Sequence, residues 1–119
     1  MRVISVRNES TGKNIGGQIE IANTSFTRMR GLLGRRQLAP EEGLWIKPSS
    51  GVHTIGMKFA IDVIGLDRKH RVVHLWNALV PNRITAVHWK ISSVLEVPAG
   101  RIVESGTRIG HTLEMDTRN

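Results

Sequence analysis

The segment from Phe59 to Leu66 constrains the fold of this chain more than any other. It reads F-A-I-D-V-I-G-L, and in an extended strand its side chains are apolar on both faces. A strand that is buried on both faces lies in the middle of a sheet. Its one charged residue, Asp62, is therefore expected among hydrocarbon side chains, where a carboxylate needs hydrogen-bond donors.

The sequence leaves two interpretations of Asp62. In the favoured one, it is a buried anchor that shapes the His53–Met57 loop, so its loss harms stability before it harms any activity. The expected donors are His53, the hydroxyl of Thr54 and backbone N–H groups of the 49–57 loop, whereas Arg30 could reach the carboxylate only through the fold. In the other interpretation, Asp62 binds a ligand or takes part in catalysis.

The segment 71–80 is also apolar on both faces, and it follows a turn-like stretch at 67–70. The two segments 59–66 and 71–80 are therefore predicted to pair as an antiparallel hairpin. Other strands are predicted from apolar patterning at 3–6, 15–21, 44–46, 92–97 and 107–115. Most strand pairing should be antiparallel, and 101–105 should form one helical turn.

Residues 24–36 show a helical rather than a strand-like period. The apolar residues Phe26, Met29, Leu32 and Leu33 recur at helical spacing after a cluster of Ser, Thr and Asn that can cap a helix. The pattern predicts a short amphipathic helix that packs these side chains into the core. It should end near Gly34, and it is expected to be the one helix longer than two turns.

The composition restricts the classes of function. A chain of 119 residues fits a single domain over 1–119, and the absence of cysteine excludes disulfides and thiolate chemistry. No metal- or cofactor-binding signature is present, so neither group is expected. The sequence also contains no apolar run of a membrane-spanning length, and we expect a cytoplasmic protein with no membrane partner.

The net charge of +7 makes polyanions plausible partners. The 17 basic residues are scattered, however, with local concentration only at 28–36 and 68–71, and aromatic residues for base stacking are few. A solvated basic surface is therefore favoured. We expect weak, sequence-independent binding of nucleic acid that vanishes near physiological salt.

Three short motifs carry a family resemblance. They contain Ala22, Thr24, Arg28, Gly31, Leu32, Leu33 and Arg35, then Gly43 with His53, Thr54, Met57, Phe59, Ile61, Asp62, Val63, Leu66 and Asp67, and finally Val94, Leu95, Glu96, Ala99 and Gly100. On these residues the chain resembles domain-of-unknown-function family 192, a widespread bacterial and archaeal group, over about 15–115.

This resemblance implies a mainly β fold, a small antiparallel β-sandwich or barrel with one short helix in the N-terminal third, and it brings no biochemical activity with it. Two positions depart from the family pattern. His70 stands in a turn where the family usually has Gly, so a left-handed backbone is expected there. His111 stands where the family tends to have Asp, which puts any polar role of that position in doubt.

Three functions remain open. The favoured one is a non-catalytic binding or interaction module, with a protein or small ligand held at a polar site where the 49–58 loop meets the helix end. The candidate residues are His53, Thr54, Met57, Asp62, Glu96 and Arg30. The second is a hydrolase-like or metal-site enzyme that uses His53, Asp62, Glu96 and possibly His111. The third is a nucleic-acid-binding protein that uses the basic helix and the 68–71 turn.

Overall fold

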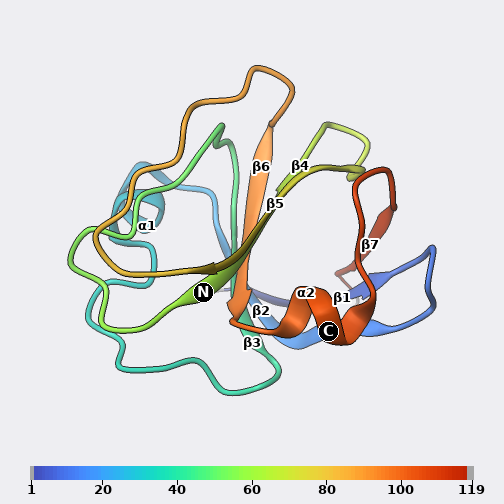
Figure 1. The fold of residues 1–119 in the computed structure, drawn as a ribbon, viewed down its shortest axis with the longest axis horizontal. Helices are drawn as coiled ribbons and strands as arrows, with labels where there is room; N and C mark the ends of the chain where they lie inside the picture. The colour runs from blue at the N-terminus through green and yellow to red at the C-terminus, as the bar shows by residue number, and fades with distance from the viewer. Residues whose placement is uncertain (1, 118–119) are drawn as a thin grey trace.

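A computed structural model describes residues 2–117 (Figure 1). The elements in chain order are β1 (Val3–Asn8), β2 (Asn14–Ala22), α1 (Ser25–Arg30), β3 (Glu42–Ile46), β4 (Ile61–Leu66), β5 (Val72–Leu79), β6 (Ser93–Pro98), α2 (Arg101–Ser105) and β7 (Leu113–Asp116). Strands therefore dominate, as the sequence predicts.

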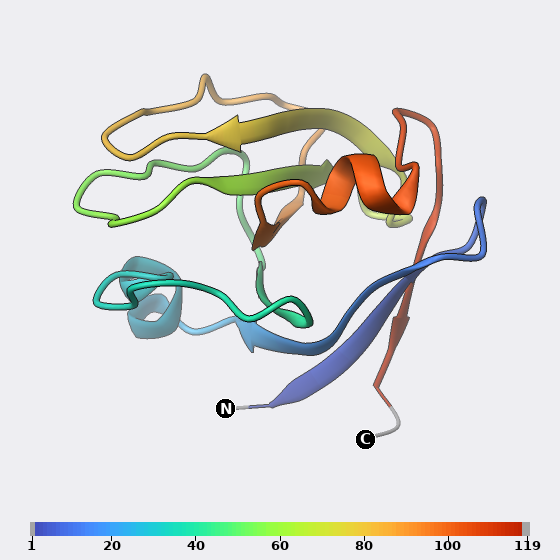
Figure 2. The same ribbon diagram turned by 60° about the horizontal axis from the view of Figure 1, so that its bottom comes forward.

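The seven strands form one sheet in the order β5-β4-β6-β3-β2-β1-β7. All neighbours are antiparallel except β2 and β3, which run parallel across the long connection that contains α1. The sheet bends strongly between the β4–β5 and β1–β2 hairpins (Figure 2), and it forms a curled half-barrel. The two edge strands approach each other at one corner, where Arg71 forms an isolated bridge with Thr112.

Apolar side chains cover both faces of the central strands. The inner cluster lies within the curl and draws members from all seven strands and from Ile102 of α2. The outer cluster covers the opposite face of β3, β4 and β6, and Leu32, Met57 and Ile91 from the loops pack onto it. This arrangement confirms the mainly β fold class and explains why β4 is buried at every position.

The antiparallel pairing predicted for residues 59–66 and 71–80 is also confirmed. β4 and β5 pair antiparallel, with Ile64 opposite Leu75, and residues 67–70 form the turn between them. His70 has a φ of 61°, the left-handed backbone expected there. The predicted last strand was too long, because residues 107–111 contain a turn at 109–110, Thr112 forms only an isolated bridge, and β7 begins at Leu113.

Helix α1 starts as predicted but differs in length and in packing. Thr24 caps it, since its side chain accepts from the Thr27 N–H while the Thr27 side chain accepts from the Thr24 N–H. The helix ends at Gly31, after six residues, and is therefore shorter than two turns. Phe26 and Met29 are 69% and 73% exposed, so the prediction that they pack into the core was wrong.

Gly43 of β3 lies at the most crowded point of the sheet. A Cβ atom there would lie 2.6 Å from the backbone oxygen of Glu96 and 2.7 Å from the Cδ1 atom of Ile19. We expect Gly43→Ala to lower the free energy of unfolding by about 1–3 kcal/mol in a urea titration, because backbone atoms cannot yield. The matched control is Gly17→Ala in β2, where the closest atom is a Glu41 side-chain oxygen 3.3 Å away, and an equal loss in both variants would contradict this explanation.

Candidate functional site

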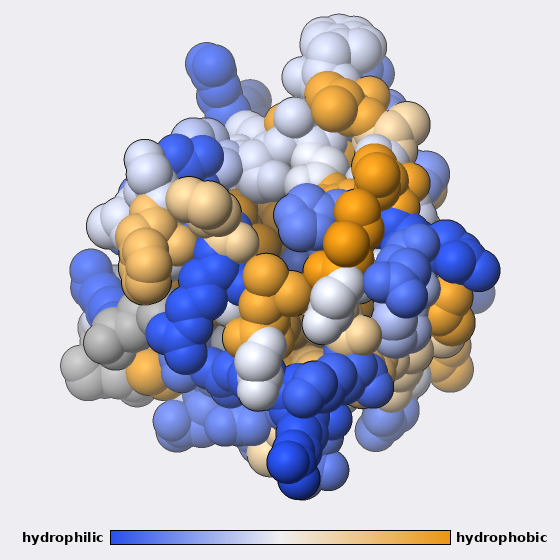
Figure 3. All heavy atoms as spheres, turned by 90° about the vertical axis from the view of Figure 1, so that its left-hand side faces the viewer, coloured by the Kyte–Doolittle hydropathy of each residue, from blue (hydrophilic) through white to orange (hydrophobic). Residues whose placement is uncertain are grey.

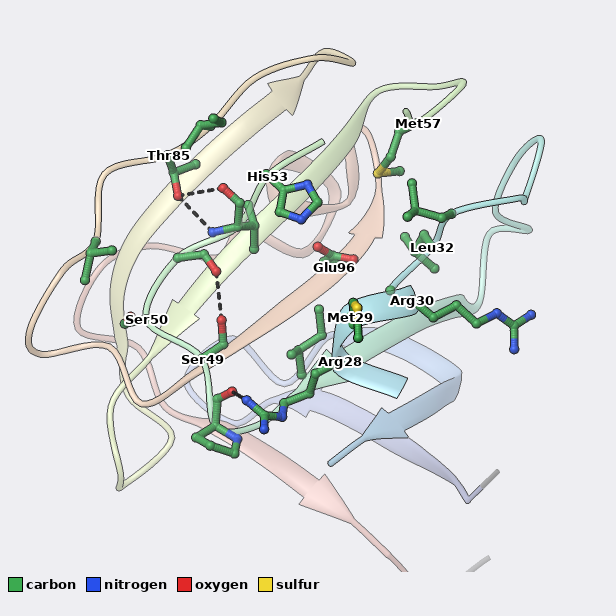
Figure 4. A pocket seen from close by; sticks show the side chains of 18 of the residues that line it. Arg28, Met29, Arg30, Leu32, Ser49, Ser50, His53, Met57, Thr85 and Glu96 are labelled. Atoms are coloured by element: carbon green, nitrogen blue, oxygen red, sulfur yellow. Dashed lines mark hydrogen bonds between the residues drawn. The ribbon is translucent and has the colours of Figure 1, made fainter. Parts of the chain in front are cut away.

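A cavity of about 550 Å³ opens between α1 and two loops, 47–57 and 81–91 (Figure 4). We call it the Glu96 cavity. Its apolar walls come from Met29, Leu32, Leu33, Ile46, Val52, Met57, Ile84 and Val87. Its charged or titratable lining residues are Arg28, Arg30, His53 and Glu96. It therefore lies where the loop at 49–58 meets the helix end.

Glu96 reaches the cavity because of its place in β6. The alternation of the strand puts Glu96 on the face of Val94 and the outer cluster, while Leu95 and Val97 enter the inner cluster. Its neighbours across the sheet, Leu44 and Val63, are both buried and apolar. A carboxyl group is thus set into a hydrocarbon surface.

The Glu96 carboxyl is directed into the cavity, with His53, Met29 and Met57 around it (Figure 4). Glu96 is 3% exposed, yet within residues 2–117 no hydrogen bond or ion pair to its side chain is present, and its carboxyl lines the open cavity. Burial raises the pKa of the Glu96 carboxyl to about 8. At neutral pH most molecules therefore hold a protonated acid here, which can both donate and accept one hydrogen bond.

The mouth of the cavity is apolar as well as basic. Ile84 and Val87 are exposed, like Met29 and Leu33, although all four side chains are apolar. Figure 3 shows such apolar side chains gathered around a hollow on this face, with hydrophilic residues around them. Beside them, the Arg28 guanidinium makes one 3.4 Å hydrogen bond to the Pro48 carbonyl, and its Nε–H has no acceptor in the described part of the chain.

Thr54 builds the wall of the cavity rather than lining it. Its hydroxyl donates to the carbonyl of Val80 at 2.7 Å and accepts from the N–H of Arg83 at 2.9 Å. A second link joins the Thr85 hydroxyl to the N–H of Val52 at 2.9 Å. These contacts tie the two loops together and give the cavity a fixed shape.

Asp62 does not belong to the cavity, and the donors expected for it were wrong. Its carboxylate accepts from the backbone N–H groups of Ala78, Gly100 and Ile102 at 2.8, 3.1 and 2.9 Å. None of these lies in the 49–57 loop. Asp62 is fully buried on the inner face, opposite to Glu96, and it holds the start of α2 against the end of β5.

The six candidate residues therefore have different places. His53, Met57, Glu96 and Arg30 line the Glu96 cavity, with the Arg30 side chain directed outward (Figure 4), Thr54 supports its wall, and Asp62 alone lies on the other face of the sheet. His111 accepts from the N–H of Arg108 and contacts the Asn8 amide, away from the cavity. Within residues 2–117, no three His, Asp or Glu side chains are grouped so that they could hold a metal ion.

The sequence did not indicate the apolar mouth. Ile84 and Val87 lie in a stretch without clear periodicity, and Met29 and Leu33 looked like core residues of a helix. Glu96 gave a stronger signal, because it is the one charged residue in the apolar run 94–97. A carboxylate in such a strand predicts either a buried partner or a site, and here it has no partner.

The curled, mainly β sheet has the same fold as small β proteins that are known from crystal structures. One is a protein of unknown function from Novosphingobium aromaticivorans, with a TM-score of 0.77 and 23% identity over 94% of this chain and 83% of that one. Another is described as a putative transcription regulator from Sinorhizobium meliloti, with a TM-score of 0.76 and 19% identity over 97% and 96% of the two chains. These likenesses concern the fold.

The chain belongs to domain-of-unknown-function family 192, described as uncharacterised ACR, whose model matches residues 5–115. A UPF0127 protein of Thermococcus sibiricus is 32% identical over 117 residues, which cover 92% of this chain and 73% of the relative. This relative is archaeal. Within residues 2–117, the helices are too short to cross a lipid bilayer.

Proposed function

We propose that the protein binds a small, largely apolar ligand in the Glu96 cavity, and that a polar end of the ligand forms a hydrogen bond with the Glu96 carboxyl. The observation that carries this proposal is the buried carboxyl without a partner, directed into an open cavity. Most buried polar side chains in proteins have a hydrogen-bond partner, and those without one need an explanation.

The expected free energies of hydrogen bonding and of apolar burial support this assignment. A ligand that excludes water from the cavity and forms a hydrogen bond with this carboxyl would gain about 1–3 kcal/mol over one that leaves the carboxyl unpaired. Four apolar side chains exposed at the mouth would also gain from being covered. A cavity with apolar walls and one convergent polar group is typical of small-molecule sites.

The basic mouth bears on the polarity of the ligand. Arg28 and Arg30 lie there, and Glu96 is mainly uncharged at neutral pH. A cationic amine would be repelled at the mouth and would have to ionise Glu96 inside. A neutral hydroxyl or amide group is not repelled at the mouth and does not have to ionise Glu96. The favoured ligands are therefore neutral molecules with a hydroxyl or amide at the end of an apolar body.

The first test uses the neutral fluorescent probe N-phenylnaphthylamine, whose emission rises in apolar surroundings. We expect saturable binding by the wild-type protein, and binding about fivefold to tenfold weaker for Ile84→Ser, because the substitution removes apolar surface at the mouth. The matched control is Val103→Ser on α2. Val103 is as exposed as Ile84 but lies outside the cavity lining. Equal binding by Ile84→Ser and the wild type would contradict the site.

Displacement of the probe by octanol then tests the role of Glu96. In Glu96→Leu the cavity stays apolar, so the probe should still bind, but the octanol hydroxyl loses its partner. We expect the affinity for octanol, measured relative to the probe, to fall about tenfold. Glu96→Gln retains a hydrogen-bonding end and should keep most of this affinity. An unchanged ratio in Glu96→Leu would overturn the proposed role of the carboxyl.

A further inference from the structure

A second hollow lies beside the Glu96 cavity and differs from it in character. It measures about 870 Å³ and is formed by α1, the 67–71 turn and the end of the 81–91 loop. Its basic lining residues are Arg28, Arg68, Lys69, Arg71 and Lys90. We call these five residues and the hollow they line the basic groove. The two regions of basic charge that are separate in the sequence, 28–36 and 68–71, thus contribute to one surface.

The basic groove contains little negative charge that is free to repel an anion. Asp67 is its one acidic lining residue, and it lies 3.6 Å from the Nε atom of Arg71. Burial alone raises the pKa of Asp67, but hydrogen bonds from the N–H groups of Arg71 and Lys69 and the charges of these two residues lower it below its ordinary value. Asp67 is therefore an ionised part of the turn and is already engaged.

The other cations of the groove are available. Arg68, Lys69 and Lys90 are exposed, and none of them forms a salt bridge in the described part of the chain, although the charge of Lys69 acts on nearby Asp67. An adjoining hollow extends the positive charge, because it shares Arg68 with the groove and is lined by Lys47 without any Asp or Glu. Burial and the charge of Lys47 lower the pKa of His70 in that hollow, so His70 is neutral there at physiological pH.

An aromatic side chain stands among these cations. Trp89 is 85% exposed and lines the groove, and the Nζ atom of Lys90 lies 5.3 Å from the centre of its ring. An indole with this exposure buries little surface against the rest of the fold. Together with neighbouring cations it offers what a nucleotide needs, a flat apolar surface for the base and a charge for the phosphate.

We propose that the basic groove binds single-stranded nucleic acid, with phosphates on Arg68, Lys69 and Lys90 and a base stacked on Trp89. This inference is independent of the ligand proposed for the Glu96 cavity. A single strand is favoured over a duplex because the bases of a duplex are already stacked on each other and cannot reach an indole. Basic residues that are scattered in the sequence thus lie together in the groove, and single-stranded nucleic acid is their proposed partner.

Fluorescence anisotropy with a labelled ten-nucleotide oligothymidylate tests this site. We expect the wild-type affinity to fall with salt, with a log–log slope of about −2 to −3 for three to four phosphate contacts. The double variant Arg68→Gln/Lys90→Gln should show a slope less steep by about 1.4. The matched double variant Lys13→Gln/Arg108→Gln loses the same charge from exposed residues outside the groove, and it should leave the slope unchanged. Equal effects of the two double variants would overturn the site.

The variant Trp89→Ala tests whether the groove binds nucleic acid in preference to other polyanions. We expect about tenfold weaker binding of the oligothymidylate, because one stacked base is lost, and unchanged binding of inorganic polyphosphate of the same length. Trp89 is exposed, so its removal should not disturb folding. Equal affinity of Trp89→Ala and the wild type for the oligothymidylate would overturn the nucleic-acid assignment, and so would tighter binding of polyphosphate or polyglutamate than of the oligonucleotide.

Discussion

Replacing Asp62 with alanine is expected to lower the free energy of unfolding by about 3–5 kcal/mol. The carboxylate accepts hydrogen bonds from three backbone N–H groups, those of Ala78, Gly100 and Ile102. Alanine would leave all three without an acceptor. Helix α2 would also lose the acceptor at its first turn, since it has no side-chain cap of its own.

Urea denaturation of Asp62→Ala, Asp62→Asn and the wild type measures this effect. Asparagine keeps one acceptor oxygen but turns an NH₂ group towards N–H donors, so its loss should be intermediate. Glu114→Gln is the control, because Glu114 makes only an exposed 3.3 Å ion pair with Arg7 and should change stability by less than about 1 kcal/mol. An alanine variant as stable as the wild type would show that the carboxylate does not hold these elements together.

The second large effect concerns the pH dependence of stability and its origin in Glu96. Burial raises the pKa of the folded-state carboxyl to about 8, from an ordinary value of 4.5. Between these two pH values the folded protein keeps the proton and the unfolded chain has lost it, so the contribution of Glu96 to stability falls as pH rises. The expected loss is about 5 kcal/mol across this window, and it is complete above about pH 8.

Unfolding free energies of the wild type and Glu96→Gln, measured from about pH 4.5 to pH 9, isolate this contribution. The variant has no ionisable group at this position, so the difference between the two curves should grow steadily in favour of glutamine. The exposed Glu9→Gln serves as a control for the loss of one carboxylate, and it should show no comparable trend. Parallel curves for the wild type and Glu96→Gln would mean that Glu96 finds a partner in the folded protein.

The sequence predicts the sheet better than it predicts the site. The β4–β5 hairpin was readable because both arms are apolar on both faces and are adjacent in the chain. The partners of Asp62 were not readable, since Gly100 and Ile102 lie about forty residues away and donate through backbone groups that carry no side-chain signal. Only the topology of the sheet brings them together.

Helix α1 shows a different reason for failure. Periodicity indicates which side chains share a face, but it does not show whether anything covers that face. Because the helix ends at Gly31, it is too short to bury Phe26 and Met29, and only Leu32 reaches the outer cluster. The exposed side of the helix then becomes one wall of the Glu96 cavity, a feature that no local pattern predicts.

The position of β6 has a consequence for how the chain is synthesised and folds. β6 lies between β3 and β4, yet it follows both in the sequence. Until it forms, the sheet consists of two separate pieces with open edges, β4–β5 and the group of β1, β2 and β3. Unpaired strand edges are prone to intermolecular pairing, and only two of the six strand pairings are local hairpins, which slows folding. A ribosome-bound chain that ends before Ser93 should therefore depend on chaperones more than the finished protein does.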